Sequence, residues 1–198
     1  MAIDLPSAVS EELAEWARRA ASAVGAGAGT RSGLRLLDAE ALHLTLCFLG
    51  SRPVGEVQTL GDALAACAEE SFELSVGAPV WLPPRRPRTL AVEIRDSGDE
   101  LVRVQERVSA ALAGACDWRP ERRRFRPHIT LARLRASVGR ARRSAALAGV
   151  GGDVAGAQPL PATPRLGFRP EAIVLYRSWL APEGASYQAL RSRTLMGG

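Results

Sequence analysis

The sequence predicts a mixed α+β domain, and three observations support this fold class. Segments with helical spacing of apolar residues are interspersed with short strand-like segments, without the regular strand–helix repeat of a parallel α/β fold. Two strand-like segments, residues 42–50 and 126–133, carry the same histidine–x–threonine pattern. The two histidines are 85 residues apart, and helical segments lie before and after each pattern. We therefore expect a single domain, residues 1–198, built as two similar, interleaved lobes.

The first half of the chain holds two predicted helices among short strands. Proline opens each helix, at Pro6 and Pro53, because proline is favoured in the first helical turn. Apolar residues then recur at helical spacing. The predicted order is a strand at 2–5, a helix from residues 6–7, a glycine-rich loop at 24–33, a strand near 34–37, the first histidine strand at 42–50 and a helix at 53–70.

We predict more strands in the second half, because alternating apolar and polar residues recur there. Residues 83–88, PPRRPR, predict a basic loop that proline stiffens. A strongly basic run, residues 119–126, immediately precedes the second histidine strand. The remaining predictions are strands at 72–76, 80–82 and 89–94, helices at 101–112 and 137–148, a low-complexity loop at 149–164, and closing strands at 171–180 and 187–195.

The composition is that of an ordinary globular chain with a basic surface. The net charge is +5, and lysine is absent, so arginine supplies every positive side chain. Such a surface concentrates phosphate-bearing partners and favours a polyanionic substrate. No apolar run approaches the roughly 20 residues that span a bilayer, and no signal-peptide pattern is present. We therefore expect a cytoplasmic protein that does not contact membranes and works as a monomer.

The cysteines indicate neither a disulfide framework nor a zinc site. Cys47, Cys67 and Cys116 are an odd number and have no C-x-x-C spacing. Cys47 shares strand parity with the first histidine, but nothing nearby in the sequence suggests a base that would activate its thiol. We expect all three to be packing residues, and we expect no metal or other cofactor.

The paired histidines are the strongest functional signal. In a strand, a residue and its second neighbour share a face, so His43 stands beside Thr45, and His128 beside Thr130. The intervening leucines and isoleucine suit a face turned toward packed helices. A lone histidine in an apolar strand is usually structural, but a matched pair predicts a site between the two lobes.

Several segments together resemble one known family, the 2H phosphoesterases, and within it the bacterial RNA 2′,3′-cyclic phosphodiesterases once called 2′-5′ RNA ligases. These segments are AIDLP, LHLTLCFLG, FELSVGAPVWLPPRRPRTLAVEI, RFRPHITLARLR and IVLYRSWLAPEGASYQAL. The resemblance covers nearly the whole chain. It implies a bilobal, pseudo-two-fold-symmetric α+β fold, in which two mostly antiparallel sheets flank a central cleft and the helices lie outside.

The resemblance also implies roles for the motif residues. His43 would donate a proton to the departing 3′ oxygen of a 2′,3′-cyclic phosphate, and His128 would accept a proton from water. The sequence alone leaves open which histidine is the acid and which the base, since a symmetric pair could exchange roles. Thr45, Thr130 and Arg133 would bind the phosphate. The residue types suit this chemistry, because histidine exchanges protons near neutral pH and threonine and arginine stabilise oxyanions. The scheme requires no metal, and its product would be a 2′-phosphate.

The arginines of the site are less defined than the histidines. Strand parity from Thr130 turns Arg133 to the opposite face, so it reaches the cleft only if the strand twists or ends there. Arg126 has the parity of His128 and is a second candidate for substrate binding. Arg88, in the stiff basic loop, is a third.

Two alternatives to hydrolysis remain open at this stage. The same cleft could join a 5′-hydroxyl to a cyclic phosphate, as a 2′-5′ RNA ligase. The chain could instead be a nucleotide- or RNA-binding module without turnover. The sequence leaves the natural substrate undecided among tRNA, a small cyclic nucleotide and an ADP-ribose derivative.

Overall fold

The structure, a computed structural model, describes residues 1–26, 33–65, 67, 71–84, 87–134, 160–181 and 184–195. Its strands pair in the order β7-β4-β5-β6-β3-β1-β8-β9, and β2 pairs with β6 beside β3. All of these pairings are antiparallel. The strands are β1 (Ala2–Ile3), β2 (Leu34–Leu36), β3 (Leu44–Thr45), β4 (Leu74–Leu82), β5 (Thr89–Arg95), β6 (His128–Leu134), β7 (Gly167–Phe168), β8 (Ala172–Ala181) and β9 (Gly184–Thr194).

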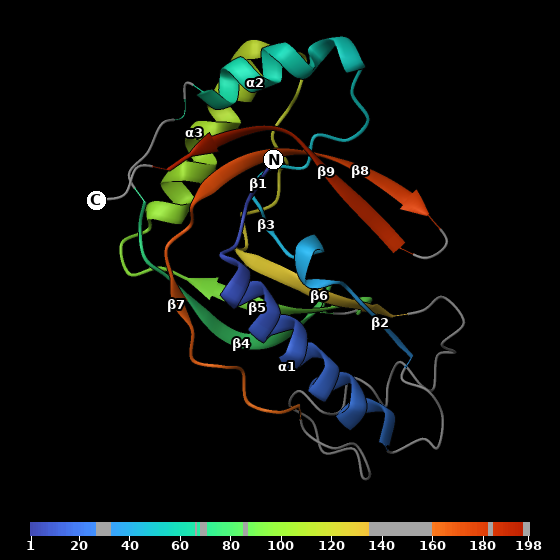
Figure 1. Cartoon of the computed structure of the whole chain (residues 1–198). Helices are drawn as coiled ribbons and strands as arrows, with labels where there is room; N and C mark the ends of the chain where they lie inside the picture. Colours follow the sequence, from blue (N-terminus) through green and yellow to red (C-terminus); the bar gives the residue numbers. More distant parts are fainter. Residues whose placement is uncertain are drawn as a thin grey trace.

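The sheet has two halves, β7-β4-β5-β6 with β2, and β3-β1-β8-β9. The helices divide between these halves (Figure 1). Helix α1 (Ser7–Ala26) packs against β2 and β6, while α2 (Val57–Ala65) and α3 (Glu100–Ala115) pack against each other, with α2 also contacting β8 and β9. Two 3₁₀ turns, η1 (Ala39–Ala41) and η2 (Val54–Glu56), precede β3 and α2. The two halves of the sheet meet where β3 pairs with β6.

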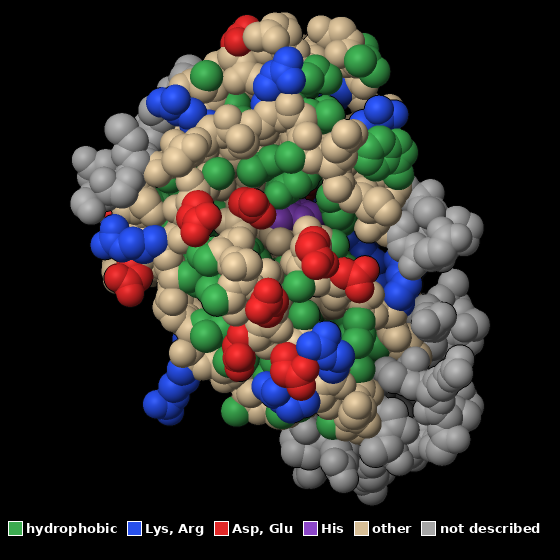
Figure 2. All heavy atoms as spheres, viewed as in Figure 1, with side chains coloured by type: hydrophobic (Ala, Val, Ile, Leu, Met, Phe, Trp, Pro, Cys, Tyr) green, Lys and Arg blue, Asp and Glu red, His purple; other side chains and the backbone are tan. Residues whose placement is uncertain are grey.

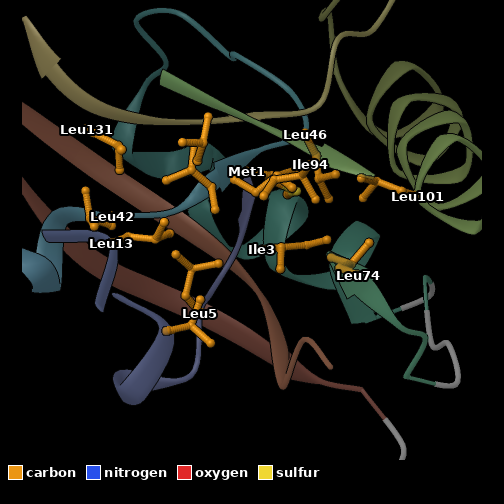
Figure 3. Packing of buried hydrophobic residues seen from close by; sticks show 14 of the residues in the cluster. Met1, Ile3, Leu5, Leu13, Leu42, Leu46, Leu74, Ile94, Leu101 and Leu131 are labelled. Carbon is orange, nitrogen blue, oxygen red and sulfur yellow. The ribbon is translucent and has the colours of Figure 1, made fainter. Parts of the chain in front are cut away.

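A row of fully buried residues crosses the middle of the sheet and forms the centre of the core. Strand pairing places the row's members opposite one another on β8, β1, β3, β6 and β5. They are Ile173, Ile3, Leu44, Ile129 and Val92, each with 0% exposure. Figure 3 shows Ile3 packed in the same cluster as Leu5, Leu74 and Leu101. Because strand side chains alternate, the residues beside this row project from the opposite face of the sheet.

The structure confirms the antiparallel α+β class expected from the sequence. Its strands form one continuous hydrogen-bonded sheet, in which the short pairings of β1 and β3 join the two halves. The helix expected from residues 6–7 begins at Ser7, and the one expected at 101–112 is α3. Among the described residues, no helix has the length and apolar character needed to cross a membrane.

Several element bounds differ from the prediction, most clearly those of the first histidine strand and of β4. The first histidine strand was expected over 42–50 but is paired only at Leu44–Thr45. Strands expected at 72–76 and 80–82 are one strand, β4, which accommodates Pro79 beside a register shift between Val76 and Pro79. Helix α2 is described over Val57–Ala65, and most of the stretch up to its predicted end near residue 70 falls outside the described residues. The predicted helix at 137–148, most of the loop at 149–164, and parts of the loops at 24–33 and 83–88 fall outside the described residues.

Candidate active site

The two histidine–x–threonine segments lie side by side as neighbouring antiparallel strands. Leu44 of β3 is directly opposite Ile129 of β6. Continuing this register by one residue in each direction places His43 opposite Thr130, and Thr45 opposite His128. Directly opposed residues have Cβ atoms about 4.5–5.5 Å apart, and diagonal pairs such as the two histidines are separated by roughly 7–8 Å. A local two-fold axis between Leu44 and Ile129 therefore relates the motifs.

The two imidazole rings are held in the same way. Nδ1 of His43 lies 2.9 Å from the carbonyl oxygen of Ala41, and Nδ1 of His128 lies 2.7 Å from that of Arg126. Each partner is two residues earlier in the chain. A carbonyl oxygen can only accept a hydrogen bond, so each Nδ1 carries the hydrogen. This leaves Nε2 of both rings for proton exchange with a ligand.

His43 is enclosed by the only two tyrosines of the chain. The ring of Tyr187 meets it edge-on with centroids 4.6 Å apart, and the ring of Tyr176 lies at 5.5 Å. The Tyr176 hydroxyl in turn donates a hydrogen bond of 3.1 Å to the Asp4 carboxylate. Burial lowers the pKa of His43, and the positive charges of the Met1 α-amino group and of Arg133 act in the same direction, while the Ala41 carbonyl and Asp4 oppose the shift. The net effect favours the neutral imidazole.

A β-bulge brings Arg133 onto the same face as the histidines. On β5, Thr89, Ala91 and Glu93 share one face, because each is two residues from the next. They lie opposite Arg133, Thr130 and His128 respectively, because β6 contains one extra residue between its pairings with Leu90 and Ala91. The bulge reverses the strand parity after Thr130, so the sequence-based expectation that Arg133 faces away does not hold. The effect of Arg133 on the His43 pKa agrees with this placement.

Members of the two motifs line two adjoining cavities, whereas Thr130 and Arg133 are among the lining residues of neither. One, of about 400 Å³, is lined by His43, and the other, of about 470 Å³, is lined by His128. Thr45, Cys47 and Phe48 line both. Figure 2 shows histidine atoms in a recess near the middle of this face of the molecule. A ligand group that bridges the two cavities at Thr45 would thus lie between the two imidazoles.

The other two predicted arginines differ in their surroundings. Arg126 lines the His128 cavity, and its guanidinium is 3.0 Å from the Glu93 carboxylate, on the strand opposite His128. Its backbone carbonyl is the group that orients His128. Arg88 is exposed and is not among the residues lining either cavity, whereas its neighbour Thr89 lines the His128 cavity. The structure therefore brings Arg126 to the site and leaves the Arg88 side chain outside the cavity walls.

Cys47 is close to the site but is not arranged as a nucleophile. It is buried, and its Sγ lies 3.3 Å from the Ser109 hydroxyl. Burial raises the pKa of its thiol. Within the described residues, no three side chains among His, Cys, Asp and Glu gather as a metal site would require.

Sequence reasoning missed the tyrosines and Glu93. Tyr176 and Tyr187 lie on the two closing strands, β8 and β9, and the pairing of these strands brings them near each other. Their contact with His43 does not, because it depends on how β1 joins β8 to β3. Glu93 could have been found only from the register of β5 against β6.

Comparisons with known proteins agree with this architecture. The sequence model of the 2′-5′ RNA ligase superfamily matches residues 5–178. An RNA 2′,3′-cyclic phosphodiesterase of Aeropyrum pernix is 30% identical over 105 residues, which are 52% of this chain. This alignment spans 59% of the relative's length.

Two solved structures extend the likeness to nearly the whole chain. The protein TT0787 of Thermus thermophilus has 27% identity and a TM-score of 0.67, covering 99% of this chain and 96% of that one. E. coli LigT complexed with 3′-AMP has 25% identity and a TM-score of 0.69, covering 98% and 95%. The resemblance inferred from the motifs is confirmed. The superfamily model spans both histidine strands and the sheet between them. The chain therefore belongs to the 2′-5′ RNA ligase superfamily.

Proposed function

We propose that this chain is an RNA 2′,3′-cyclic phosphodiesterase, which hydrolyses 2′,3′-cyclic phosphate ends to 2′-phosphates without a metal ion. The observation that carries the proposal is the pairing of Leu44 with Ile129, which sets two histidines and two threonines on one face. Family membership and the phosphodiesterase relative support the choice of substrate. All groups in the scheme come from a single chain, so we expect a monomer to be active.

The proposed reaction needs one base and one acid on opposite sides of phosphorus. Nε2 of His128 accepts a proton from water as the water oxygen bonds to phosphorus. The bond from phosphorus to the 3′ oxygen breaks, and Nε2 of His43 gives that oxygen a proton. The products are a 2′-phosphate and a free 3′-hydroxyl. Since Nδ1 of each ring is occupied by a carbonyl, both proton transfers use Nε2.

The threonines and Arg133 would stabilise the charge that develops on the phosphate. Thr45 lies opposite His128, and Thr130 opposite His43, so each hydroxyl is placed to donate to a non-bridging oxygen beside the partner strand's imidazole. Arg133 adds a positive charge on the same face. The same charge lowers the pKa of His43. A bound phosphate anion acts in the opposite direction and favours the protonated ring that a proton donor requires.

The proposal is tested with a 2′,3′-cyclic nucleotide and a cyclic-ended oligoribonucleotide, incubated in EDTA. We expect a 2′-phosphate product from the native chain and a loss of about 10²–10⁴-fold in kcat for His43→Ala and for His128→Ala. Turnover that EDTA abolishes and Mg²⁺ or Mn²⁺ restores would contradict the metal-free scheme. Turnover unchanged in both alanine variants would contradict the roles of the histidines.

Ligation in the same cleft is the second candidate, because the matching family is named for it. A 5′-hydroxyl would replace water beside His128, and the same bond to the 3′ oxygen would break. Water is present at high concentration, so ligation requires an acceptor held in place. Adding a 5′-hydroxyl oligoribonucleotide to the assay and looking for a 2′-5′-linked product distinguishes the two activities. Binding of cyclic-ended RNA without any product would instead indicate a non-catalytic binding module.

A further inference from the structure

The segment from Asp117 to Pro127 is a basic surface beside the proposed catalytic cleft. Arg119, Arg122, Arg123 and Arg124 are all exposed. Arg123 and Arg124 line the same cavity as His128. Glu121 also lines it, so the segment still carries an excess of positive charge at the cavity mouth. We refer to residues 119–124 as the basic rim.

The arginines of the basic rim have no acidic partner in the part of the chain that the structure describes. Some arginines elsewhere on the surface do, including Arg18 with Glu15 at 2.7 Å and Arg103 with Glu100 at 2.7 Å. Beside the rim, Arg126 is paired with Glu93. Uncompensated guanidinium groups on an exposed rim are free to pair with phosphates from solution.

The rim is anchored at both ends, which fixes its position relative to the cleft. The Trp118 indole N–H donates to the carbonyl of Phe48, a residue that lines both cavities. Arg52 donates to the carbonyl of Asp117 at 2.9 Å. At the other end, the Ile94 amide donates to the carbonyl of Pro127. A rim held in this way loses little conformational entropy when it binds a ligand.

From these observations we propose that the basic rim binds the sugar–phosphate backbone of single-stranded RNA whose cyclic end lies between the histidines. The proposal rests on the phosphodiesterase function and narrows its substrate class to oligoribonucleotides. A free cyclic nucleotide has no phosphate beyond the reacting one, so it gains less from the rim than an oligonucleotide does. Binding through phosphates is independent of base sequence and weakens with salt.

The test compares the native chain with a triple variant carrying Arg122→Gln, Arg123→Gln and Arg124→Gln. The substrates are oligouridylate ending in a 2′,3′-cyclic phosphate and free 2′,3′-cyclic UMP, which share one reacting group. We expect the variant to raise KM for the oligonucleotide about tenfold or more at low salt, and to change the kinetics of cyclic UMP much less, because Arg123 and Arg124 line the His128 cavity but Arg122 does not. The salt slope of oligonucleotide binding should fall by about 2 for three lost phosphate contacts, at roughly 0.7 per contact.

A matched control removes the same charge at residues that line neither cavity, with Arg18→Gln, Arg19→Gln and Arg103→Gln. Each of these arginines is exposed and paired with a glutamate. The control should behave like the native chain. Equal weakening in both triple variants would overturn the proposal, as would a native chain that uses oligonucleotide and cyclic UMP with the same kcat/KM.

Failure of the phosphodiesterase function is distinguished by a binding measurement. Fluorescein-labelled oligouridylate ending in a 2′-phosphate is titrated with each protein, and anisotropy gives Kd. If no substrate is turned over but the rim variant alone binds more weakly, the hydrolysis proposal is wrong and the rim proposal holds. If the rim variant binds as tightly as the native chain, the rim proposal is wrong whatever the activity.

Discussion

Leu44 on β3 lies directly opposite Ile129 on β6, and both side chains are fully buried. The two halves of the sheet meet at this pair. Its register determines which residues face the cleft. Because side chains alternate along a strand, burying Leu44 and Ile129 projects the flanking histidines and threonines from the other face. The hydrophobic core and the candidate site are therefore specified by the same register.

Truncating this pair should destabilise the fold. Leu44→Ala removes a fully buried side chain from the central row, and we expect it to lower the free energy of unfolding by about 2–5 kcal/mol. Urea denaturation measures the loss. Val54→Ala is the control, because Val54 is 79% exposed and its truncation should change stability by less than about 0.5 kcal/mol. Similar losses in both variants would show that the row is not central to the core.

The charge of Arg133 should be visible in the titration of His43. Arg133 lowers the pKa of His43, so Arg133→Gln is expected to raise that pKa. NMR titration of the histidine ring protons measures the shift, with His128→Gln used to assign the two signals. Arg88→Gln is the matched control and should leave the His43 pKa unchanged, because Arg88 is not among the groups that shift it. A His43 pKa that responds equally to both substitutions would contradict the placement of Arg133.

Most of the site could be predicted from the sequence, for a physical reason. His43 with Thr45, and His128 with Thr130, are two residues apart, and the period of a strand alone places each pair on one face. The side on which Arg133 lies could not be predicted, because a bulge adds a residue to β6 and reverses the parity. Nothing in RPHITLARLR marks the extra residue, since it depends on the partner strand.

The contacts between distant elements could not be predicted from the sequence either. The two tyrosines contact His43 only because β1 pairs with both β3 and β8. The brevity of β3 has a similar origin, since residues after Thr45 continue the apolar pattern but pair with Met1 rather than within a long strand. Within the described residues, the local pattern therefore predicted the main helices and strands and the face of the histidines, while boundaries and cross-sheet contacts required the structure.

The hydrogen bond from Tyr176 to Asp4 should contribute to stability. Tyr176→Phe keeps the ring against His43 but removes a donor to a carboxylate, and we expect a loss of roughly 1–2 kcal/mol in the free energy of unfolding. Tyr187→Phe is the control, since the described residues offer its hydroxyl no hydrogen-bond partner. Chemical denaturation of both variants is the measurement. A larger loss for Tyr187→Phe would contradict the assignment.

Stability should depend on pH through His43. Its pKa in the folded chain lies below the ordinary value of 6.5, so the unfolded chain binds the proton more tightly. The free energy of unfolding should therefore fall as pH drops through 6.5, and level off below the folded-state pKa. His43→Gln removes this contribution and should reduce the slope of the profile in this window. The slope that remains is expected from the Met1 α-amino group, because burial lowers its pKa from 8.0 to about 6. A profile identical in the native chain and in His43→Gln would show that His43 is not desolvated in the folded state.

The central claim is that two imidazoles from distant parts of the chain act on one phosphate. A crystal structure with a bound nucleoside 2′-phosphate, the proposed product, tests it most directly. The account predicts one phosphate within hydrogen-bonding distance of Nε2 of both His43 and His128, with Thr45 and Thr130 donating to its oxygens. A nucleotide bound at either histidine alone, with its phosphate outside the space between the rings, would contradict it.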